Sequence, residues 1–527
     1  MKLRLTKAGR VVIFVLIAAI VCTGGFFAWK HFGDDAVALI ENFGSDKLEQ
    51  NVVEETTTPN KTETNKEQNV NVSEPVINLS LDEWIGWKPI IDANQGLTTQ
   101  PGSIFDELGI KVNINVINDA EASSNALIKG DLNAAGYTLN RTAFLSGKFS
   151  DAGLDVVMPV FTNYSDGGDG IIALSKFNTI ESLIDAKIGV PKFSEAQSLV
   201  IWFVNKSDLS DADKQKIIDN LILLDDAEQT GQAFFAGSLD VAATWQPYLS
   251  NAEDSTNSHI LFDTTSSNKL IMDGILFRAD FAQAHPDVVS AFINGIFKAE
   301  EMYETEFDYI REVMPMFAGS SDEDILGMCG DAGLMGYSEN VNALENDCPT
   351  VYADMCAIWE SIGETVDRTL GATLFDTSYV KTLSDQYSSL QQTPTFEVTE
   401  EQKESVKEVE ALLTKSASLN FISDTAKFVD NAEADAILRE FVDIAKTLDG
   451  TIIQIEGNIN STTTNEVGMM LSEERAKTVK NYFVANGIDP DRIIVVGNGN
   501  TKMVVDPGSP DAELNRRTDI FFKTIED

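Results

Sequence analysis

Histidine and cysteine are the side chains best suited to metal binding and nucleophilic catalysis, and this 527-residue sequence contains few of either. Its 3 histidines are His31, His259 and His285, and its 4 cysteines form no CxxC motif. Zinc sites and Cys/His catalytic pairs need such groups in close motifs, and no HExxH motif or Cys/His cluster occurs. A GxxxxGK[ST] loop for nucleotide phosphates is also absent. We therefore expect no metal, no cofactor and no catalytic residue.

Charge and composition narrow the class of protein further. The chain has 39 Lys and Arg against 83 Asp and Glu, a net charge of −44. A surface this acidic repels phosphate backbones, so we expect no nucleic-acid partner. Hydrophobic residues make up 43%, enough for sizeable cores, and the length predicts two or three folded units. Paired carboxylates in so acidic a chain leave an enzyme open as an alternative.

The N-terminus has the features of a membrane anchor. Residues 11–29 (VVIFVLIAAIVCTGGFFAW) are 19 residues without a charge, long enough to cross a bilayer as a helix. The positive-inside rule then places residues 1–10 in the cytoplasm and exports the rest of this single-pass chain. A cleaved signal peptide and a lipoprotein with its lipid on Cys22 are the alternatives. The basic residues before the segment, with no acidic one among them, are Lys2, Arg4, Lys7 and Arg10.

The three other cysteines, Cys329, Cys348 and Cys356, would all be exported. An odd number permits at most one internal disulfide and leaves one thiol over. Three buried free thiols are the alternative, and the sequence does not decide which pair would form.

Composition divides the exported chain into two folded blocks. Residues 30–75 predict a flexible linker, because most of this stretch is rich in Glu, Asn, Thr and Lys and cannot bury a core. Block 76–391 alternates strand-like and helix-like runs, which predicts an α/β architecture with largely parallel sheets, mostly helical after Pro286. The polar stretch 392–416 predicts a second linker before the block 417–527. Predicted strands are 111–118, 155–161, 170–174, 186–191 and 239–245, and predicted helices are 122–130 and 211–224.

The C-terminal block alternates helices with strands and ends on a strand. Strands are predicted at 451–457, 492–497 and 518–525, and a helix at 471–485 ends before a capping Gly487. This order predicts a compact α/β sandwich. Residues spaced for the inner faces of its helices are Ile437, Phe441, Ile444 and Leu448, then Ala476, Val479 and Phe483.

Four runs of this block resemble the motifs of OmpA-like domains. The resemblance covers the whole block and implies non-covalent binding of peptidoglycan. In such domains an Asp and an Arg hold the free charged end of a diaminopimelate residue. The runs are IEGNINS (455–461), LSEERAKTVKNYFVANGI (471–488), RIIVVGNGN (492–500) and ELNRRTDIFF (513–522).

By residue matching, Arg475 takes the place of the family's Arg, which can clamp a carboxylate through two hydrogen bonds. The Asp position holds Asn460, a neutral acceptor. This departure implies weaker wall binding or a differently modified stem peptide, and a domain kept only as a spacer is the alternative. The terminal motif is matched by Asn515, Arg516 and Arg517, and we expect one of these arginines to support the site while the other faces solvent.

The central block is similar to the solute-binding proteins of ABC importers, in the group with nitrate, sulfonate and pyrimidine receptors. The resemblance implies a type II periplasmic-binding-protein-like domain with two α/β lobes, a hinge and a ligand held between the lobes. The supporting runs are WIGWKPIIDANQGL (84–97), ALIKGDLNAAGYTLNRTAF (126–144), SDGGDGIIAL (165–174), TIESLIDAKIGVPKFSEAQSLV (179–200), AFFAGSLDVAATWQPYLSNA (233–252) and MDGILFRADFAQAHPDVV (272–289).

Ligands of such sheets lie beyond the carboxyl ends of strands, near helix N-termini. The candidate ligand-binding residues therefore follow the strands: Trp87 as a wall or lid, Thr138 as a hydroxyl donor, and Ser165, Asp169, Ser194, Trp245 and Asp273. As alternatives, the tryptophans could be packing residues, the glycine-rich loop at Asp169 a plain turn, and the acids helix caps. If Asp169 and Asp273 both line the site, its ligand should carry a cation or hydrogen-bond donors.

The order of these parts predicts a membrane-anchored receptor that passes a small solute to an ABC permease while its C-terminal domain binds peptidoglycan. A passive tether between membrane and wall is the main alternative. A stator is disfavoured, because residues 11–29 contain no ionisable group to carry ions. One relative of the receptor fold acts in pyrimidine synthesis through an active-site His, but neither His259 nor His285 lies in a recognisable motif.

Overall fold

The computed structural model describes residues 75–267, 269–387, 398–461 and 466–524. The chain divides into the units 1–74 and 75–527, and only the second is described below. The expected anchor at 11–29 and the linker up to residue 74 lie outside the described residues. Among the described helices, none combines the length and apolar character needed to cross a membrane.

The first lobe is built on a six-stranded sheet in the order β11-β4-β10-β3-β1-β2. Strands β1, β2 and β3 are parallel, whereas β10 runs antiparallel to β3 and β4. The first residues of β10 therefore lie beside the carboxyl ends of β1 and β3, at the same end of the sheet. The strand bounds are β1 Val76–Leu81, β2 Lys111–Val116, β3 Ala134–Thr138, β4 Val156–Ser165, β10 Met272–Arg278 and β11 Ala332–Leu334.

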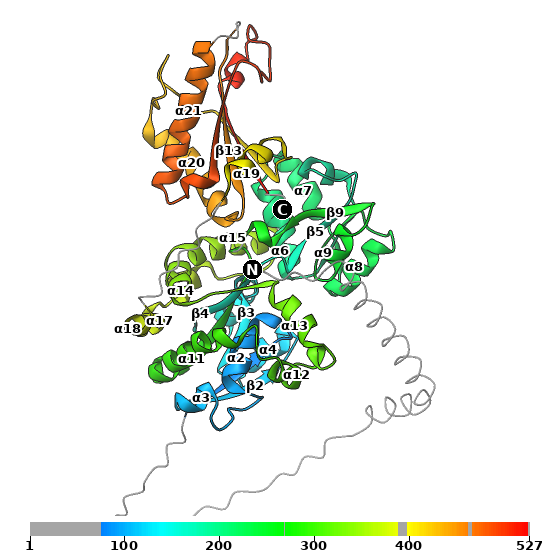
Figure 1. Cartoon of the computed structure of the whole chain (residues 1–527), viewed down its shortest axis with the longest axis vertical. Helices are drawn as coiled ribbons and strands as arrows, with labels where there is room; N and C mark the ends of the chain where they lie inside the picture. The colour runs from blue at the N-terminus through cyan, green and yellow to red at the C-terminus, as the bar shows by residue number, and fades with distance from the viewer. Residues whose placement is uncertain (1–74, 268, 388–397, 462–465, 525–527) are drawn as a thin grey trace, which may run out of the picture. The chain divides into compact units, whose positions relative to one another are not determined.

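Helices from distant parts of the sequence pack together on this lobe, as the blue and green segments of Figure 1 show. For example, α11 packs on α2 and α3. The helices are α2 Lys88–Asn94, α3 Ile104–Glu107, α4 Ala120–Lys129, α5 Leu139–Asp151, α10 Ala279–Ala284, α11 Pro286–Ala299, α12 Asp308–Val313, α13 Asp322–Cys329, α14 Tyr337–Asn342, α15 Cys348–Ser361, α16 Gly371–Leu374, α17 Ser378–Lys381 and α18 Ser384–Tyr387.

The second lobe has a five-stranded sheet in the order β7-β6-β8-β5-β9. Strands β6, β7 and β8 are parallel, and β5 runs antiparallel to β8 and β9. Its elements are β5 Asp169–Leu174, β6 Ile188–Pro191, α6 Glu195–Lys206, α7 Asp211–Asp219, β7 Ile222–Leu224, α8 Ala227–Phe235, β8 Val241–Trp245, α9 Tyr248–Glu253 and β9 Ser258–Asp263.

The chain crosses between the lobes from β4 to β5 and again from β9 to β10. Side-chain hydrogen bonds join the two crossings: the hydroxyls of Ser165 and Thr264 lie 2.9 Å apart, and the Gly167 N–H donates to Thr264 Oγ1 at 3.0 Å. Two sheets joined by two adjacent crossings form the two-lobed α/β architecture expected for the central block.

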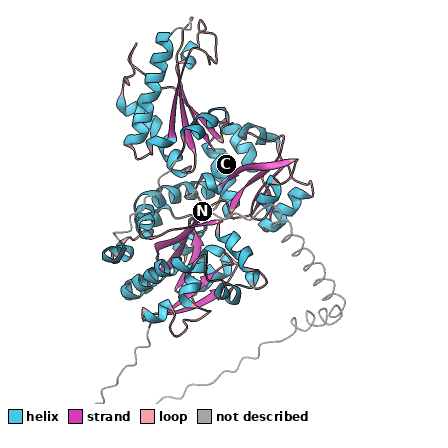
Figure 2. Ribbon diagram, in the orientation of Figure 1, coloured by secondary structure: helices cyan, strands magenta, loops and turns pink. Residues whose placement is uncertain are grey.

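The C-terminal block is an α/β sandwich built on a four-stranded sheet. Figure 2 shows its helices lying against its strands. The sheet order is β12-β15-β13-β14, with β13 and β14 parallel and the other pairs antiparallel. Its elements are α19 Glu400–Ser405, β12 Leu413–Ala417, α20 Asn431–Thr447, β13 Ile452–Asn458, α21 Glu466–Ala485, β14 Ile493–Gly499 and β15 Thr518–Lys523.

Local sequence signals explain where many of these helices begin. A Ser, Thr or Asp side chain accepts a hydrogen bond from a backbone N–H of the first turn, which satisfies a donor that the helix leaves unpaired. Helix α4 also ends at Gly130, whose positive φ of 82° favours glycine. The capping residues include Asp119 of α4, Thr138 of α5, Ser194 of α6, Ser210 of α7 and Asp430 of α20.

Three details differ from the sequence-based expectations. The helix predicted at 211–224 ends at Asp219, and residues 222–224 form strand β7 beside β6. Both lobes have mixed rather than largely parallel sheets. The strand that follows each crossing between the lobes, β5 or β10, runs antiparallel to both of its neighbours. Strand β12 begins at Leu413, inside the polar stretch 392–416, because Leu413 and Lys415 are buried where β12 pairs with β15.

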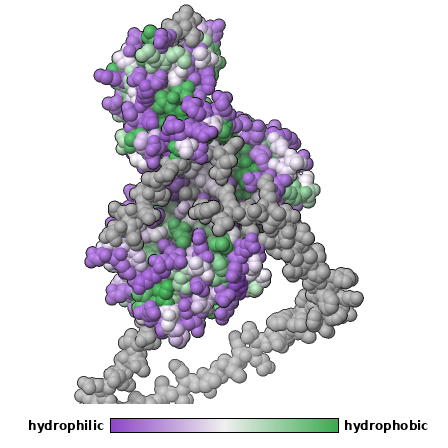
Figure 3. Space-filling model, viewed as in Figure 1, coloured by the Kyte–Doolittle hydropathy of each residue, from purple (hydrophilic) through white to green (hydrophobic). Residues whose placement is uncertain are grey.

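Side chains divide between core and surface as their chemistry predicts. The inward residues expected for the last helix, Ala476, Val479 and Phe483, are all fully buried. Cys329, Cys348 and Cys356 are buried free thiols, so the structure contains none of the possible disulfides among them. Hydrophilic residues cover most of the described surface on the face shown in Figure 3, in keeping with the net charge of −44.

Candidate functional site

An ion pair joins the lobes where β3 and β6 lead into helices α5 and α6. Thr138 caps α5, and its Oγ1 donates to Glu195 Oε1 at 2.7 Å. Arg141, in the first turn of α5, reaches the same carboxylate, with 3.0 Å between its Nη2 and Glu195 Oε2. Burial acts to raise the pKa of Glu195, but the charge and hydrogen bonds of Arg141 outweigh it and hold that pKa below its ordinary value.

Asp82 follows β1 directly, so it lies at the same end of the sheet as Thr138. Its Oδ1 accepts a hydrogen bond from Trp87 Nε1 at 2.6 Å. Burial among protein atoms raises the pKa of Asp82, against the Trp87 hydrogen bond, and Glu195 raises it further. Asp82 is nevertheless exposed to solvent, so its carboxyl is accessible from outside the protein.

Asp273, near the start of β10, lies opposite Thr138 on one side and Asn163 on the other. It is only 5% exposed. Burial raises its pKa well above the ordinary value, and Asp82, Glu195 and Asp169 raise it further. The indole N–H of Trp84 opposes this shift of the Asp273 pKa, and its hydrogen bond goes to Asn163 Oδ1 at 2.9 Å.

Asp169 begins β5 at the first crossing between the lobes. Its Oδ2 accepts a hydrogen bond from Ser165 Oγ at 2.8 Å, and its backbone N–H donates back to that hydroxyl at 3.1 Å. Burial raises the pKa of Asp169 to about 7, against the Ser165 hydrogen bond. Trp245 lies opposite Asp169 on strand β8 and is 42% exposed, so an accessible aromatic ring adjoins this acid.

These groups form what we call the carboxylate cluster, made of Asp82, Asp169, Glu195 and Asp273. Within the described residues, Arg141 is the one basic side chain that forms an ion pair with the cluster. Such an arrangement can bind a ligand through charge and hydrogen bonds, and Trp84 and Trp245 add aromatic surface beside it. Among the described residues, no three His, Cys, Asp or Glu side chains are placed to hold a metal ion.

The structure brings Thr138, Asp169 and Asp273 together at this cluster, with Trp245 beside them. Ser165 holds Asp169 in place at the crossing. The Ser194 hydroxyl is used within its own turn, since it donates to the Pro191 carbonyl at 2.7 Å and accepts from the Gln197 N–H at 3.2 Å.

Trp87 needs a correction. Its side chain is 1% exposed, so the ring lies in the core of the first lobe rather than forming a wall or lid. The ring fits because Gly136 leaves space, and a Cβ there would lie 2.9 Å from the Trp87 ring. Trp87 therefore contributes to the site by positioning Asp82 through its hydrogen bond.

Sequence reasoning missed Asp82, Trp84, Arg141 and Glu195. Asp82 carried a usable signal, because it is the first residue after strand β1. Glu195 and Arg141 lie one and three residues beyond the predicted Ser194 and Thr138. Their role depends on a contact between α5 and α6, which the local pattern of either helix does not reveal.

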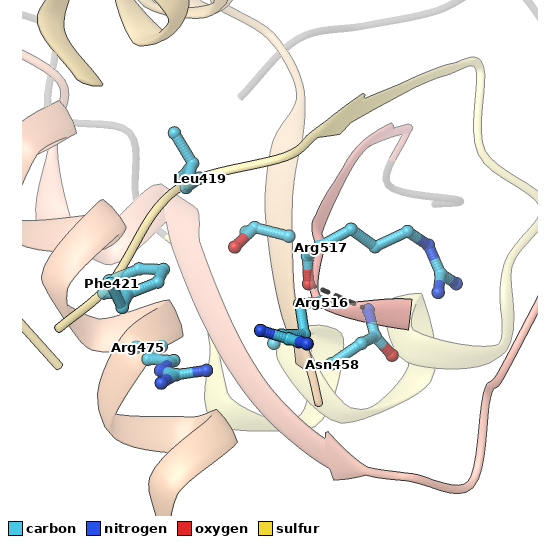
Figure 4. A pocket seen from close by; sticks show the side chains of 8 residues that line it. Leu419, Phe421, Asn458, Arg475, Arg516 and Arg517 are labelled. Atoms are coloured by element: carbon cyan, nitrogen blue, oxygen red, sulfur yellow. Dashed lines mark hydrogen bonds between the residues drawn. The ribbon is translucent and has the colours of Figure 1, made fainter. Parts of the chain in front are cut away.

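A second site lies in the C-terminal block, where a pocket opens between α21 and the edge of the sheet (Figure 4). Arg475 packs on Phe421, with 4.9 Å from its guanidinium carbon to the ring centroid, and its Nε donates to the Thr425 carbonyl at 3.1 Å. Burial lowers the pKa of Arg475, and the nearby charge of Arg516 lowers it further. The lining residues are Leu419, Phe421, Gly457, Asn458, Arg475, Arg516, Arg517 and Thr518.

The matched residues of the terminal motif have two roles: some line the pocket, and others hold the neighbouring backbone in place. Arg516 is exposed, whereas the Arg517 side chain extends away from Arg475 in Figure 4 and pairs with Asp519 at 2.9 Å. Asn515 is buried and accepts hydrogen bonds from the backbone N–H groups of 504 and 505. The amide of Asn460 is engaged on both sides, with its Nδ2 on the Pro507 carbonyl and its Oδ1 on Asn515 Nδ2.

Most of the C-terminal block matches a known protein family. Residues 420–517 match the family model described as the OmpA family. They form an OmpA domain. Outer membrane protein A of Bordetella avium is 33% identical over 110 residues, which cover 20% of this chain and 57% of that protein. Photosystem I P700 chlorophyll a apoprotein A2 of Gloeobacter violaceus is 31% identical over 112 residues, 20% of this chain and 13% of that protein. The chain thus spans less than two thirds of either relative.

Two solved structures are similar to part of this chain. The periplasmic aliphatic sulphonate binding protein SsuA of Escherichia coli aligns at 14% identity and a TM-score of 0.46, covering 58% of this chain and 99% of that protein. The periplasmic nitrate-binding protein NrtA of Synechocystis PCC 6803 aligns at 10% identity and a TM-score of 0.43, covering 61% of this chain and 92% of that protein.

The OmpA domain confirms the family expected from the motifs at 455–522. Its pocket combines Arg475 and Arg516, and within the described residues neither arginine forms an ion pair with an acidic side chain. Two uncompensated guanidinium groups favour an anion, and a carboxylate can accept two hydrogen bonds from one guanidinium.

Proposed function

We propose that the protein is an extracytoplasmic receptor that delivers a small solute to an ABC importer. In this proposal, residues 11–29 anchor it in the cell membrane, and the OmpA domain holds it on peptidoglycan. The observation that carries the proposal is the carboxylate cluster, whose members come from both lobes and meet beside the two chain crossings.

The cluster supports solute binding because its geometry depends on both lobes. Asp82 and Asp273 belong to the first lobe, while Asp169 and Glu195 belong to the second. A ligand that contacts both sets is bound most completely when the lobes are close together, so that its binding free energy stabilises one arrangement of the lobes. A permease can then distinguish the loaded receptor from the empty one.

The pocket of the OmpA domain supports attachment to the wall. Arg475 and Arg516 supply the charge that a stem-peptide carboxylate requires. Asn460 supplies no negative charge for an ammonium group, so the proposed contact rests on the carboxylate alone. We expect binding weaker than that of a domain with Asp at this position.

Thermal unfolding of the full chain in detergent tests the receptor function. The compounds are nitrate, sulfonates, phosphate, phosphonates, pyrimidines, amines and amino acids, added after a cycle of unfolding and refolding that removes bound ligand. A ligand at 100 times its dissociation constant stabilises by about 2.7 kcal/mol and shifts the midpoint by several degrees. A shift with one class is the expected result.

Pelleting with purified peptidoglycan tests the wall attachment independently. Pelleting without a thermal shift by any compound would favour the alternative function, a passive tether between membrane and wall. A thermal shift without pelleting would leave a receptor whose OmpA domain serves as a spacer.

A further inference from the structure

We infer that the site between the lobes binds an organic cation, such as an amine or a quaternary ammonium compound, rather than an oxyanion. The inference rests on the proposed receptor function and names the class of its solute. Three independent features of the carboxylate cluster and its surroundings support it.

The first feature is that the position most favourable for an anion is already filled. The N-terminus of helix α6 carries a partial positive charge, and Arg141 and the Thr138 hydroxyl point at the same place. The Glu195 carboxylate occupies that position, with hydrogen bonds of 2.7 Å from Thr138 and 3.0 Å from Arg141. An incoming oxyanion would have to displace it.

The second feature is the excess of acidic groups that no cation compensates. Arg141 compensates Glu195, but within the described residues no Lys, Arg or His forms an ion pair with Asp82, Asp169 or Asp273. Asp273 is more than nine-tenths buried, and the Trp84 indole N–H, which lowers its pKa against burial, gives its hydrogen bond to Asn163 Oδ1 at 2.9 Å. A buried carboxylate without a cation is costly, so a ligand that supplies the missing charge gains binding energy there.

The third feature is aromatic surface next to the acids. Trp245 lies opposite Asp169 on the neighbouring strand and is accessible, and Trp84 donates to Asn163, the cross-strand partner of Asp273. The face of an indole ring attracts cations, most strongly when they are alkylated and weakly hydrated. Carboxylates together with indole faces therefore favour an organic cation over a bare metal ion, which gains little from the rings.

Isothermal titration calorimetry with the full chain in detergent tests this inference. Choline, putrescine and agmatine are the cationic probes, nitrate and ethanesulfonate are the anionic probes, and calcium chloride tests a metal ion. We expect saturable binding of at least one organic cation, weakened at least tenfold in Asp273→Asn and in Asp169→Asn. The control Asp280→Asn, at an exposed residue paired with Arg278, should bind as wild type does.

The outcomes separate the inference from the receptor function. Binding of an anion or of calcium, with no binding of the three organic cations, would overturn the inference and leave the receptor function in place. Binding of none of the six probes would count against both. The melting midpoints of the Asn variants should equal or exceed that of wild type, because each variant removes an uncompensated carboxylate. A lowered midpoint together with lost binding would assign Asp273 a structural role and overturn the inference.

Discussion

Arg141 of the first lobe and Glu195 of the second form an ion pair across the boundary between the lobes, with 3.0 Å between Nη2 and Oε2. Both side chains lie at the start of a helix, and Thr138 donates to the same carboxylate. The pair therefore links the lobes at the edge of the carboxylate cluster. The positive charge of Arg141 offsets the negative charge of Glu195 there.

Removal of Arg141 should destabilise the protein. Arg141→Met leaves Glu195 beside three other carboxylates without a cation, and we expect a loss of about 1–3 kcal/mol, since the pair is partly accessible. Urea unfolding followed by tryptophan fluorescence measures the change. The control Lys216→Met breaks an exposed ion pair with Asp185 and should alter the free energy of unfolding by less than about 0.5 kcal/mol. Equal effects of the two substitutions would contradict the proposed role of Arg141.

The pKa of Asp169 predicts a pH dependence of stability. In the folded chain it is raised to about 7 from the ordinary value of 3.8. The folded state therefore binds the proton more tightly, and this contribution to stability is complete below pH 4 and is lost as the pH rises to about 7. The free energy of unfolding of Asp169→Asn relative to wild type should accordingly increase between pH 4 and pH 7. A difference that is constant over this range would show that the carboxyl titrates normally.

The buried pair Lys88–Asp92 makes a separate prediction for the core of the first lobe. Nζ and Oδ2 are 2.5 Å apart, and both side chains are fully buried. Lys88→Met should cost about 3–5 kcal/mol, because it leaves the Asp92 carboxyl buried without its cation. The double variant Lys88→Met/Asp92→Leu should recover most of that loss in urea unfolding. A double variant no more stable than Lys88→Met alone would refute this explanation.

Peptidoglycan pelleting should depend on Arg475. Arg475→Ala removes the guanidinium group that packs on Phe421 at the pocket, and we expect at least a tenfold loss of the pelleted fraction at limiting peptidoglycan. Arg439→Ala provides a matched control, because Arg439 is an exposed arginine on α20 paired with Asp435. Pelleting that is equal for both variants would exclude the pocket as the binding site.

Much of the fold could be predicted from the sequence, because the signals are local. Strand-like runs at 111–118 and 170–174 became β2 and β5, and the inner face of α21 was read from its helical spacing. The OmpA motifs located Arg475 directly. The helix predicted at 211–224 was too long because the apolar run at its end pairs with β6, a partner that local periodicity does not reveal.

The candidate site was only partly predictable, since its geometry depends on tertiary contacts. Trp87 was expected at the ligand, but Gly136 on a distant strand leaves room for its ring in the core. Glu195 was overlooked because its importance comes from Arg141, which lies 54 residues earlier in the sequence. Asp273 was among the residues proposed from the sequence, but its proximity to Asp82 becomes evident only when β1 and β10 are placed in one sheet.

The most direct test of the receptor function is native mass spectrometry of the full chain, purified in mild detergent from its own membranes without unfolding. The account predicts that the native chain is heavier than the denatured chain by one small molecule. That excess mass should be absent from the double variant Asp169→Asn/Asp273→Asn and retained in the control Asp280→Asn. A native chain with no excess mass that also binds no solute added afterwards, or an excess that the double variant retains, would contradict solute binding at the carboxylate cluster.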